Sequence, residues 1–401
     1  MELLTNSVRN YAWGSTSAIA GVQGRPVPSP EPEAELWMGG HPSAPSRLTR
    51  DGVEYGLDTV IAADPAGELG PAASRGARVP FLMKLLAAET PLSLQAHPSE
   101  EQARAGFAAA EAAGLQIGDP RRSYVDPHHK PELLCAVGEF SALCGFRPVE
   151  HSVAVLTPVV SAVPALEPLV DALRLTPDGG GLRTFVASLF GLPDADQVAA
   201  AFTDACRKGP DGPYSADYAL AVEVAEQFPG DLGVVLALLL NRLDLTPGEA
   251  IFLPAGVLHA YLRGVGVEIM ACSDNVLRGG LTPKHVDVAE LLRVVRFEVM
   301  SPDPFPASEP APGVRVWAPP VPEFALTRVV LDEAGGRASL ASEGPRILFC
   351  LEGTVSVEDG SGPVELRGGQ AGYVSAGHRD VTVTGSGTLF QATTGFQATT
   401  G

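Results

Sequence analysis

The sequence predicts a mainly β protein with an α-helical insertion, in which the β regions form two jelly-roll-like barrels. Three observations lead to this fold class. Short apolar runs bounded by glycine and proline occupy both the first and the last parts of the chain. A helical pattern of apolar residues fills the stretch 149–240. A segment near residue 250 also returns, in weakened form, near residue 370.

The first 148 residues are expected to begin the first barrel, the catalytic one. Residues 1–98 are typical of short strands and turns. Ser99 and Gln102 then form the N-terminal pattern of a helix that extends to residue 114. An apolar run at 132–146 predicts a buried strand.

Residues 149–240 are expected to be an α-helical insertion that divides the first barrel. Proline and glycine separate four segments with helical spacing of apolar residues, at 153–173, 181–190, 195–205 and 216–228. We interpret the alanine and leucine stripes of these segments as helix-packing surface.

Residues 241–299 are expected to complete the first barrel, with strands from residue 245 onward and one helix at 287–295. The stretch 300–322 is rich in proline and predicts a linker. Residues 323–401 are expected to form the second barrel.

This second barrel is expected to be a degenerate copy of the first. Segment 245–259 aligns with 366–380 at an offset of 121 residues, and leucine, glycine and an Ala-Gly turn coincide. Asp380 stands where the first copy has His259, so the second copy has lost that imidazole. His378 lies two residues before this position and is interpreted as a surface residue.

Composition and the start of the chain argue against several functional classes. A net charge of −19 argues against a nucleic-acid partner, and the absence of an apolar run of about 18 residues argues against a membrane span. The start of the chain has neither the basic nor the apolar part of a secretory signal. Five widely spaced cysteines are typical of free thiols in a reducing cytoplasm. We therefore expect a cytoplasmic protein, and a monomer. Residues 396–401 duplicate 390–395, and we expect no function for them.

Three short segments contain candidate metal ligands. Gln95 and His97 are two residues apart, so their side chains would share one face of a strand. Glu132 follows His-His-Lys-Pro at the start of the predicted strand, and His259 follows a Pro-Ala-Gly turn. Two imidazoles, one carboxylate and one amide oxygen suit a divalent cation, zinc first, with room for water or substrate.

These segments resemble those of the type I mannose-6-phosphate isomerases, zinc enzymes of the cupin superfamily. Three further motifs in the same order are similar to signatures of that family: Tyr11–Ser15, Glu35–Pro42 and Asn275–His285. The resemblance implies two cupin barrels and one zinc ion (Zn2+) per chain. It also implies the interconversion of mannose 6-phosphate and fructose 6-phosphate. By resemblance the zinc ligands are Gln95, His97, Glu132 and His259, and Arg278 is catalytic.

That reaction removes a proton beside a carbonyl group and returns it to the neighbouring carbon through a cis-enediol. Zinc can hold the substrate oxygens and stabilise the enediolate, and Arg278 can stabilise the same negative charge. A base must lie on the substrate face. Glu268 and Lys130 are both candidates, and Glu268 could instead be a rim carboxylate paired with Arg263.

The substrate itself adds a requirement. A sugar phosphate is an anion, so the pocket of this acidic protein must carry its own positive potential. Ser93 and Lys284 are candidates for holding the phosphate group, Tyr261 is a further candidate for substrate contact, and His129 is a candidate for helping to open the sugar ring. Two of the chain's four lysines, Lys130 and Lys284, lie in these motifs.

Two other function classes remain open at this point. An iron-dependent cupin dioxygenase would use similar ligands, but Gln95 and the segment 275–285 count against it. A non-catalytic sugar-binding cupin would not need Lys130, Glu268, Arg278 and Lys284 together. The sequence also leaves open whether the step serves mannose catabolism or the supply of precursors for GDP-mannose biosynthesis.

Overall fold

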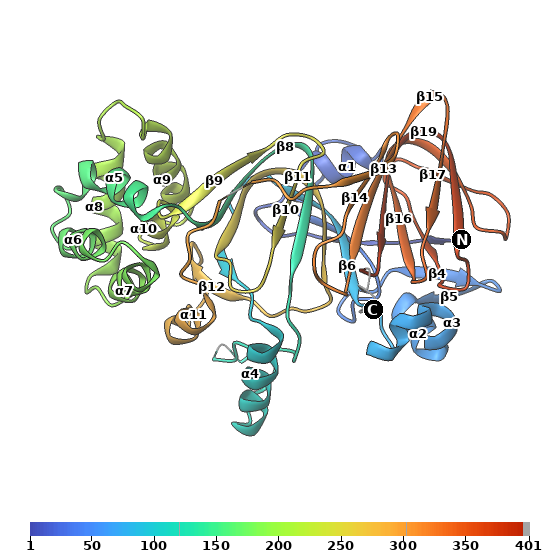
Figure 1. Cartoon of the computed structure of the whole chain (residues 1–401), viewed down its shortest axis with the longest axis horizontal. Coiled ribbons are helices and arrows are strands. Elements are labelled where there is room, and N and C mark those ends of the chain that lie inside the picture. The colour runs from blue at the N-terminus through green and yellow to red at the C-terminus, as the bar shows by residue number, and fades with distance from the viewer. Residues whose placement is uncertain (120, 302, 396–401) are drawn as a thin grey trace.

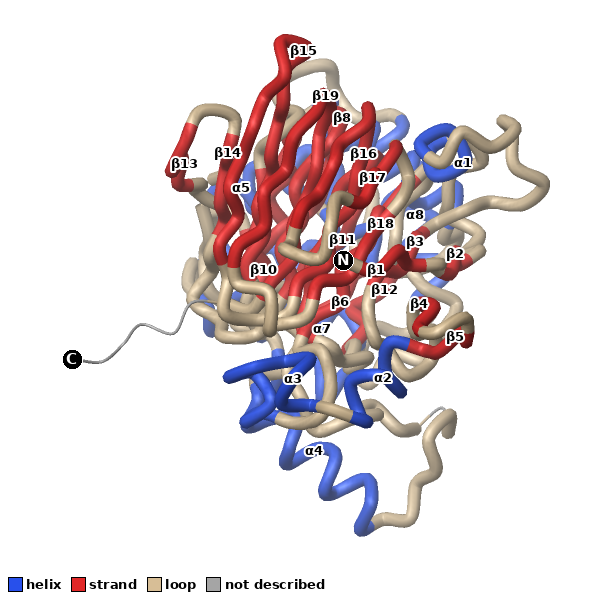
Figure 2. Tube along the Cα trace, turned by 90° about the vertical axis from the view of Figure 1, so that its right-hand side faces the viewer, coloured by secondary structure: helices blue, strands red, loops and turns tan. Residues whose placement is uncertain are grey.

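The computed structural model describes residues 1–119, 121–301 and 303–395, and the duplicated end 396–401 lies outside this part. A group of helices, a nine-stranded sheet and an eight-stranded sheet follow one another along the long axis of the molecule (Figure 1). The nine-stranded sheet stands in the middle and is called the catalytic sheet below. The eight-stranded sheet, called the C-terminal sheet, faces the viewer in Figure 2.

The catalytic sheet is antiparallel and is built from strands on both sides of the helical region. Its main order is β10 (Ala250–Leu253), β8 (Glu132–Phe146), β11 (His259–Ala271), β6 (Phe81–Ala88), β3 (Glu35–Met38) and β2 (Ser7–Arg9). Outside this path, β9 (Leu240–Leu245) pairs with β8, and β7 (Leu94–Ala96) pairs with both β11 and β12 (Leu277–Gly280). The predicted strand at 132–146 is therefore confirmed.

The C-terminal sheet is also antiparallel. Its order is β1 (Glu2–Leu4), β18 (Ala371–Val374), β16 (Arg346–Glu358), β19 (Asp380–Thr393), β15 (Ala325–Ala341), β14 (Val314–Trp317) and β13 (Ser308–Ala311), with β17 (Val364–Arg367) on β16. A small hairpin of β4 (Arg47–Arg50) and β5 (Val53–Gly56) stands apart.

Two features of the C-terminal sheet depart from the expected organisation. The N-terminal strand β1 pairs with β18, so the start of the chain belongs to this sheet rather than to the catalytic one. The stretch 300–322, expected to be a linker, contains β13 and β14, because Val314–Trp317 pairs with β15 in spite of the flanking prolines.

The mainly β class with an inserted helical region is confirmed, whereas two closed barrels are not observed. Within the described ranges, each large sheet keeps open edges, because no pairing joins the first strand of its main path to the last. The physical reason lies in the long central strands. β8 pairs with β10 along its first half and with β9 along its second, and β11 bends at register shifts near Arg263 and Gly264. The catalytic sheet curls in this way without joining its edges.

The repeat predicted at an offset of 121 residues has a structural counterpart. Strands β10 and β18 begin at 250 and 371, and β11 and β19 begin at 259 and 380. Asp380 therefore opens β19 as His259 opens β11. The strand partner of Leu253 is Glu132, whereas the partner of Val374, the counterpart of Leu253, is Arg346.

The inserted helices are α5 (Val149–Val160), α6 (Glu167–Leu175), α7 (Gly179–Phe190), α8 (Ala195–Arg207), α9 (Ser215–Gln227) and the short α10 (Gly233–Ala237). The prediction of one helix over 153–173 was wrong, because the chain turns between 161 and 166, where Pro164 removes a backbone donor. The helix α7 begins where Asp178 accepts a hydrogen bond from the amide of Gly181 at 3.0 Å.

Other helices flank the sheets. The predicted capping box is present in α4 (Glu100–Ala112), between Ser99 and Gln102, and α11 (Val288–Val294) lies in the predicted helix at 287–295. Three short helices and a 3₁₀ turn were not expected within 1–98: α1 (Ala18–Val22), α2 (Leu57–Ala63), α3 (Pro65–Leu69) and η1 (Gly70–Arg75). Over the described residues, no helix is long and apolar enough to cross a membrane.

The alternation of side chains along the catalytic sheet decides which residues reach the site. Leu85, Leu133 and Val267 pack into an apolar cluster that also contains Phe349 and Phe390 of the C-terminal sheet. Their neighbours in the chain must point to the opposite face of the same strands. That face therefore carries three buried charged side chains, one from each of β6, β8 and β11: Lys84, Glu132 and Glu268.

Candidate active site

His97, Glu132 and His259 form a buried group on this face of the catalytic sheet. One ligand atom from each residue lies within 4.8 Å of the others. His97 Nε2 is 3.3 Å from Glu132 Oε1, and His259 Nε2 is 3.5 Å from Glu132 Oε2. No other group of three or more His, Cys, Asp or Glu with this spacing occurs in the described part of the chain. The group is thus a candidate metal centre.

A contact between Nδ1 and a backbone carbonyl oxygen fixes the orientation of each imidazole. His97 Nδ1 lies 2.8 Å from the carbonyl oxygen of Asn275, and His259 Nδ1 lies 2.9 Å from that of Val257. Each Nδ1 therefore carries the proton and donates, which leaves both Nε2 atoms with a lone pair that points into the group. Metal-binding histidines typically donate the N–H group of their other ring nitrogen to a carbonyl or carboxylate oxygen in this way.

The buried donor atoms fit a bound cation. Within the described residues, His97 Nε2, His259 Nε2 and Glu132 Oε2 are buried and have no hydrogen-bond partner. Three such atoms in one place cost free energy unless something satisfies them. Gln95 is a candidate for a fourth donor, an amide oxygen, because it is the strand partner of His259 across β7 and β11 and lines the adjoining cavity. Two nitrogens and two oxygens form a donor set that zinc accepts.

The protonation states agree with this interpretation. Burial lowers the pKa of His97 to about 4, so its imidazole is neutral near pH 7. Burial alone would raise the pKa of Glu132, but Lys130, His97 and His259 hold it well below its ordinary value. A neutral imidazole and an ionised carboxylate are the forms that bind a metal ion.

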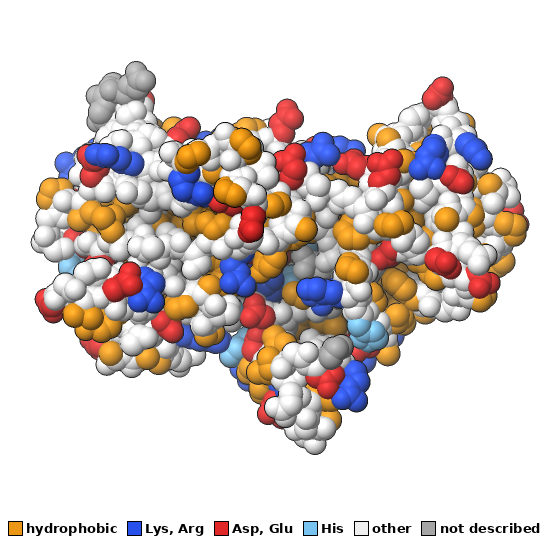
Figure 3. Space-filling model, turned by 180° about the vertical axis from the view of Figure 1, so that it is seen from behind, with side chains coloured by type: hydrophobic (Ala, Val, Ile, Leu, Met, Phe, Trp, Pro, Cys, Tyr) orange, Lys and Arg blue, Asp and Glu red, His pale blue; other side chains and the backbone are white. Residues whose placement is uncertain are grey.

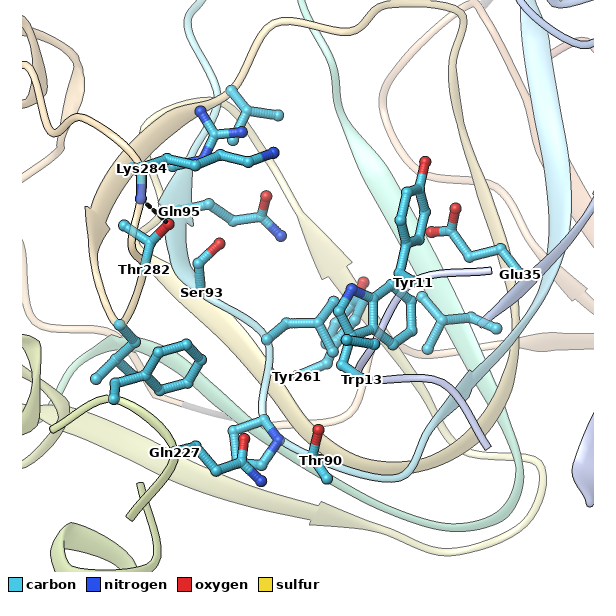
Figure 4. Close-up of a pocket in the computed structure, with 18 of the residues that line it drawn as sticks. Tyr11, Trp13, Glu35, Thr90, Ser93, Gln95, Gln227, Tyr261, Thr282 and Lys284 are labelled. Carbon is cyan, nitrogen blue, oxygen red and sulfur yellow. Dashed lines mark hydrogen bonds between the residues drawn. The ribbon is translucent and has the colours of Figure 1, made fainter. Parts of the chain in front are cut away.

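A cavity of about 1100 Å³ opens beside this group. Ser93, Gln95, Thr282 and Lys284 gather on one side of it, and Tyr11, Trp13 and Glu35 gather on the other (Figure 4). Seen from behind, several Lys and Arg side chains lie beside a hollow in the middle of the molecule (Figure 3). Five acidic side chains also line the cavity, so the local positive potential that an anionic substrate requires must come from four cations: Lys84, Lys130, Arg278 and Lys284.

A chain of buried polar side chains forms another wall of the cavity. Lys84 Nζ lies 3.0 Å from Glu268 Oε2 and 3.2 Å from Glu35 Oε1. Tyr261 donates its hydroxyl proton to Glu268 Oε1 at 2.9 Å, and Trp37 Nε1 donates to Glu35 Oε2 at 2.7 Å. Both oxygens of Glu268 are thereby held in place.

Neighbouring charges shift the pKa values of these buried side chains. Although burial alone lowers the pKa of Lys84, the carboxylates of Glu268, Glu35 and Glu132 raise it above its ordinary value. Burial, together with Glu132 and Glu35, raises the pKa of Glu268. Glu268 is therefore a stronger base than an ordinary carboxylate when it is ionised.

Two further cations line the cavity. Lys130 Nζ lies 2.8 Å from Glu132 Oε1, at the edge of the metal group. Arg278 stands opposite Gln95 across β12 and β7. It makes no hydrogen bond or ion pair with any described residue, and burial lowers its pKa. Its guanidinium is therefore available to an anion in the cavity.

The structure brings together most of the residues chosen from the sequence, with two corrections. His129, expected to contact substrate, does not line the cavity in the described structure, and its Nε2 lies 3.2 Å from Glu323. The backbone amide of His129, in the turn before Pro131, donates a hydrogen bond to Glu100. This bond fixes the turn in a position from which the ring points away from the cavity. The alternative pairing of Glu268 with Arg263 is also wrong, because Arg263 bonds to Glu223.

Sequence reasoning missed several residues that line the cavity. Lys84 and Glu35 were given no role, although a lone lysine within the apolar run 81–88 was a visible signal. Gln227 and Asp231 come from the end of the helical insertion, and a pattern of packing helices gave no sign of them. Asp231 accepts hydrogen bonds from the amides of Gly233 and Thr282, which fixes one rim of the cavity.

Comparison with known proteins gives consistent matches over the chain. Residues 1–149 match the family model "Phosphomannose isomerase type I, catalytic domain". The chain is similar to mannose-6-phosphate isomerase of Escherichia coli K12, with 38% identity over 392 residues that cover 97% of this chain and 98% of that protein. It is also similar to mannose-6-phosphate isomerase of Homo sapiens, with 32% identity over 409 residues and 93% of each chain covered.

Solved structures agree. A mutant of phosphomannose isomerase from Salmonella typhimurium superposes with a TM-score of 0.91 at 35% identity, and the match covers 99% of this chain and 100% of that one. A mannose 6-phosphate isomerase bound with zinc and yttrium superposes with a TM-score of 0.89 at 35% identity, with the same coverage.

Proposed function

The chain belongs to the type I phosphomannose isomerase family, and we propose that it interconverts mannose 6-phosphate and fructose 6-phosphate with one bound zinc ion. The observation that carries this proposal is the buried group of His97, Glu132 and His259 beside a cavity that is lined by both basic and acidic side chains. The zinc-bound relative and the family match support the isomerase over an iron dioxygenase or a non-catalytic sugar-binding protein.

Gln95, His97, Glu132 and His259 would hold the zinc ion. When bound, zinc supplies a Lewis acid that stabilises negative charge on substrate oxygens. The chain's part is to present these donors in the correct protonation state. The carbonyl groups of Asn275 and Val257 keep both imidazoles in one tautomer, as described above.

Glu268 is the proposed base that carries the proton between the two substrate carbons. Its pKa is raised, it lines the cavity, and both of its oxygens are held, by Tyr261 and by Lys84. A positioned carboxylate can take the proton from one carbon and return it to the next on the same face. Lys130 is the other candidate, but its ammonium already bonds to Glu132.

Arg278 is the proposed stabiliser of the enediolate charge. It lines the cavity without a partner of its own in the described structure, so its donors are free for substrate. Ser93 and Lys284 are the proposed phosphate contacts, because both lie on the same side of the cavity in Figure 4. The phosphate would then lie on the side of the cavity opposite Trp13.

We propose that the two large sheets are two cupin-type units, and that only the first keeps a ligand set. We propose a cytoplasmic location, because all five cysteines are free and buried, as expected for a reducing compartment. We also propose a monomer. Size-exclusion chromatography with light scattering tests the oligomeric state.

A coupled assay with mannose 6-phosphate, in wild type and two variants, tests the reaction and the choice of base. Glu268→Gln should lower kcat by about 10²-fold or more while the zinc content is unchanged. Lys130→Met should lower kcat less than Glu268→Gln. The reverse order would give the role of the base to Lys130, and a wild type without isomerase activity would end the functional proposal.

A further inference from the structure

We propose that the C-terminal sheet binds a small oxyanion, such as free phosphate, sulfate or the phosphate group of a metabolite, between Arg315 and Arg328. These two side chains line a pocket of about 370 Å³ that shares no residue with the active cavity. Arg315 belongs to β14 and Arg328 to β15, and Pro247, in the turn before β10, contributes from the catalytic sheet.

The two arginines are direct neighbours across the sheet. Arg315 and Arg328 are opposite partners in the antiparallel pair of β14 and β15. Like charges in directly opposite positions destabilise such a pair. The arrangement is therefore unfavourable for the protein alone, and an anion between the two guanidinium groups would reverse the sign of the interaction.

The acidic side chain in the pocket can neutralise only one of the two arginine charges. Glu309 is the only carboxylate among the described residues that line it, and it accepts from Arg315 Nε at 2.7 Å. Arg328 has no hydrogen bond or ion pair with any residue in the described ranges, although it is half-buried. One positive charge thus remains in the pocket of a chain whose net charge is −19.

A glycine allows the two guanidinium groups to converge. A Cβ atom at Gly248 would lie 2.5 Å from Arg328 Nη1 and 3.5 Å from Arg315 Nη1. The two nitrogens therefore approach the same point and are no farther apart than the sum of those distances. Because Gly248 has a φ of +88°, only glycine adopts this turn easily. Two planar guanidinium groups at this separation can both donate to one oxyanion.

The occupant would connect the two large sheets. The turn that carries Pro247 and Gly248 leads directly into β10 of the catalytic sheet, whereas both arginines belong to the C-terminal sheet. We therefore expect the anion to stabilise the folded chain more than it changes turnover. A ligand that binds only the folded state raises the unfolding temperature by mass action.

Thermal unfolding of the full-length, zinc-loaded protein in sodium phosphate, with sodium chloride of equal ionic strength as the reference, tests the site. The phosphate concentration for half of the stabilisation should rise about 10-fold or more in Arg328→Gln, because charge-assisted hydrogen bonds are lost. It should stay unchanged in Arg367→Gln, which removes an exposed arginine bonded to Glu365 in the same sheet. It should fall in Glu309→Gln, because the competing carboxylate is gone.

Two further measurements separate this site from the active cavity and identify the source of the anion. Inhibition of the isomerase by phosphate reports the active cavity, and it should be equal in wild type and Arg328→Gln. A sugar phosphate in place of free phosphate should show the same dependence on Arg328 if the phosphate group is what binds. Crystals soaked in selenate should show an anomalous peak between the two arginines.

The proposal fails on either of two results. One is an equal phosphate response of wild type and Arg328→Gln, which would assign all binding to other sites. The other is a selenate peak in the active cavity with none between Arg315 and Arg328. Neither result would affect the proposed isomerase activity, which is measured separately.

Discussion

Replacing Lys84 with methionine tests the buried network beside the proposed metal site. The ammonium lies 3.0 Å from Glu268 Oε2 and 3.2 Å from Glu35 Oε1, and the side chain of Lys84 is only 6% exposed. Methionine keeps most of the apolar stem but removes the charge. Two buried carboxylates would then face each other with one hydrogen bond each, from Tyr261 and Trp37.

The loss of unfolding free energy is limited, because the folded variant can bind a proton on one of the two carboxylates. Removing one partner of a buried ion pair costs about 3–5 kcal/mol. The folded variant can escape part of this cost by protonating one carboxylate. At pH 7 that step costs about 3.7 kcal/mol for a group with an ordinary pKa of ~4.3. We therefore expect the free energy of unfolding to fall by about 3–4 kcal/mol at pH 7.

The pH dependence has a definite sign. In the variant, a carboxylate whose folded-state pKa is raised binds a proton more readily in the folded state than in the unfolded state. The loss should therefore shrink as the pH falls from 7 to 5, by up to about 1.4 kcal/mol per unit. In the wild type the raised pKa of Lys84 keeps the ammonium charged, so its contribution persists throughout this range and is lost only well above pH 10.

Urea unfolding of the zinc-loaded protein, followed by tryptophan fluorescence, measures the effect. Trp37 lies within the network, whereas Trp317 reports on the C-terminal sheet. Lys208→Met is the matched control, because Lys208 is exposed at the end of α8, and it should change stability by less than about 0.5 kcal/mol. A loss below about 1 kcal/mol at pH 7, or one that does not change with pH, would refute this reasoning.

Three other predictions concern the active cavity, the second sheet and the thiols. Arg278→Ala should lower kcat by about 10²-fold or more with zinc content intact, and Arg278→Lys should recover little, because an ammonium lacks the planar fork; an effect mainly on KM would make Arg278 a ground-state anchor instead. Asp380→Ala and His378→Ala should leave zinc content and turnover near wild type, and a second zinc bound there would contradict the degenerate-copy interpretation. Burial raises the pKa of Cys272 to about 11 and of the other four cysteines to about 12, so the native protein should resist thiol reagents at pH 8. Five thiols should react after unfolding, and rapid labelling of the native chain would contradict this.

The candidate metal group could be predicted from sequence because its residues sit in short, regular contexts. Gln95 lies in β7 and His97 directly follows the end of that strand, and Glu132 and His259 each begin a strand of the same sheet. Strand alternation then determines the face to which each side chain points. The structure adds the carbonyl groups that orient the imidazoles, which come from loops and have no local signal.

The misses have physical causes too. Lys84 lies in the apolar run 81–88, and only the pairing of β6 with β11 and β3 shows that two carboxylates meet it. The position of His129 depends on a hydrogen bond that its backbone amide donates to Glu100, which is distant in sequence. Closure of a sheet depends on edge pairing between strands far apart in the chain, and a pattern of alternating residues carries no information about it.

Metal analysis of the purified protein, combined with the coupled assay, tests the central claim most directly. The wild type should contain about one zinc per chain and convert mannose 6-phosphate to fructose 6-phosphate. His97→Ala and His259→Ala should lose both the zinc and the activity, because too few donors remain for tight binding. Stoichiometric zinc retained in these two variants, or iron in its place in the wild type, would contradict the account.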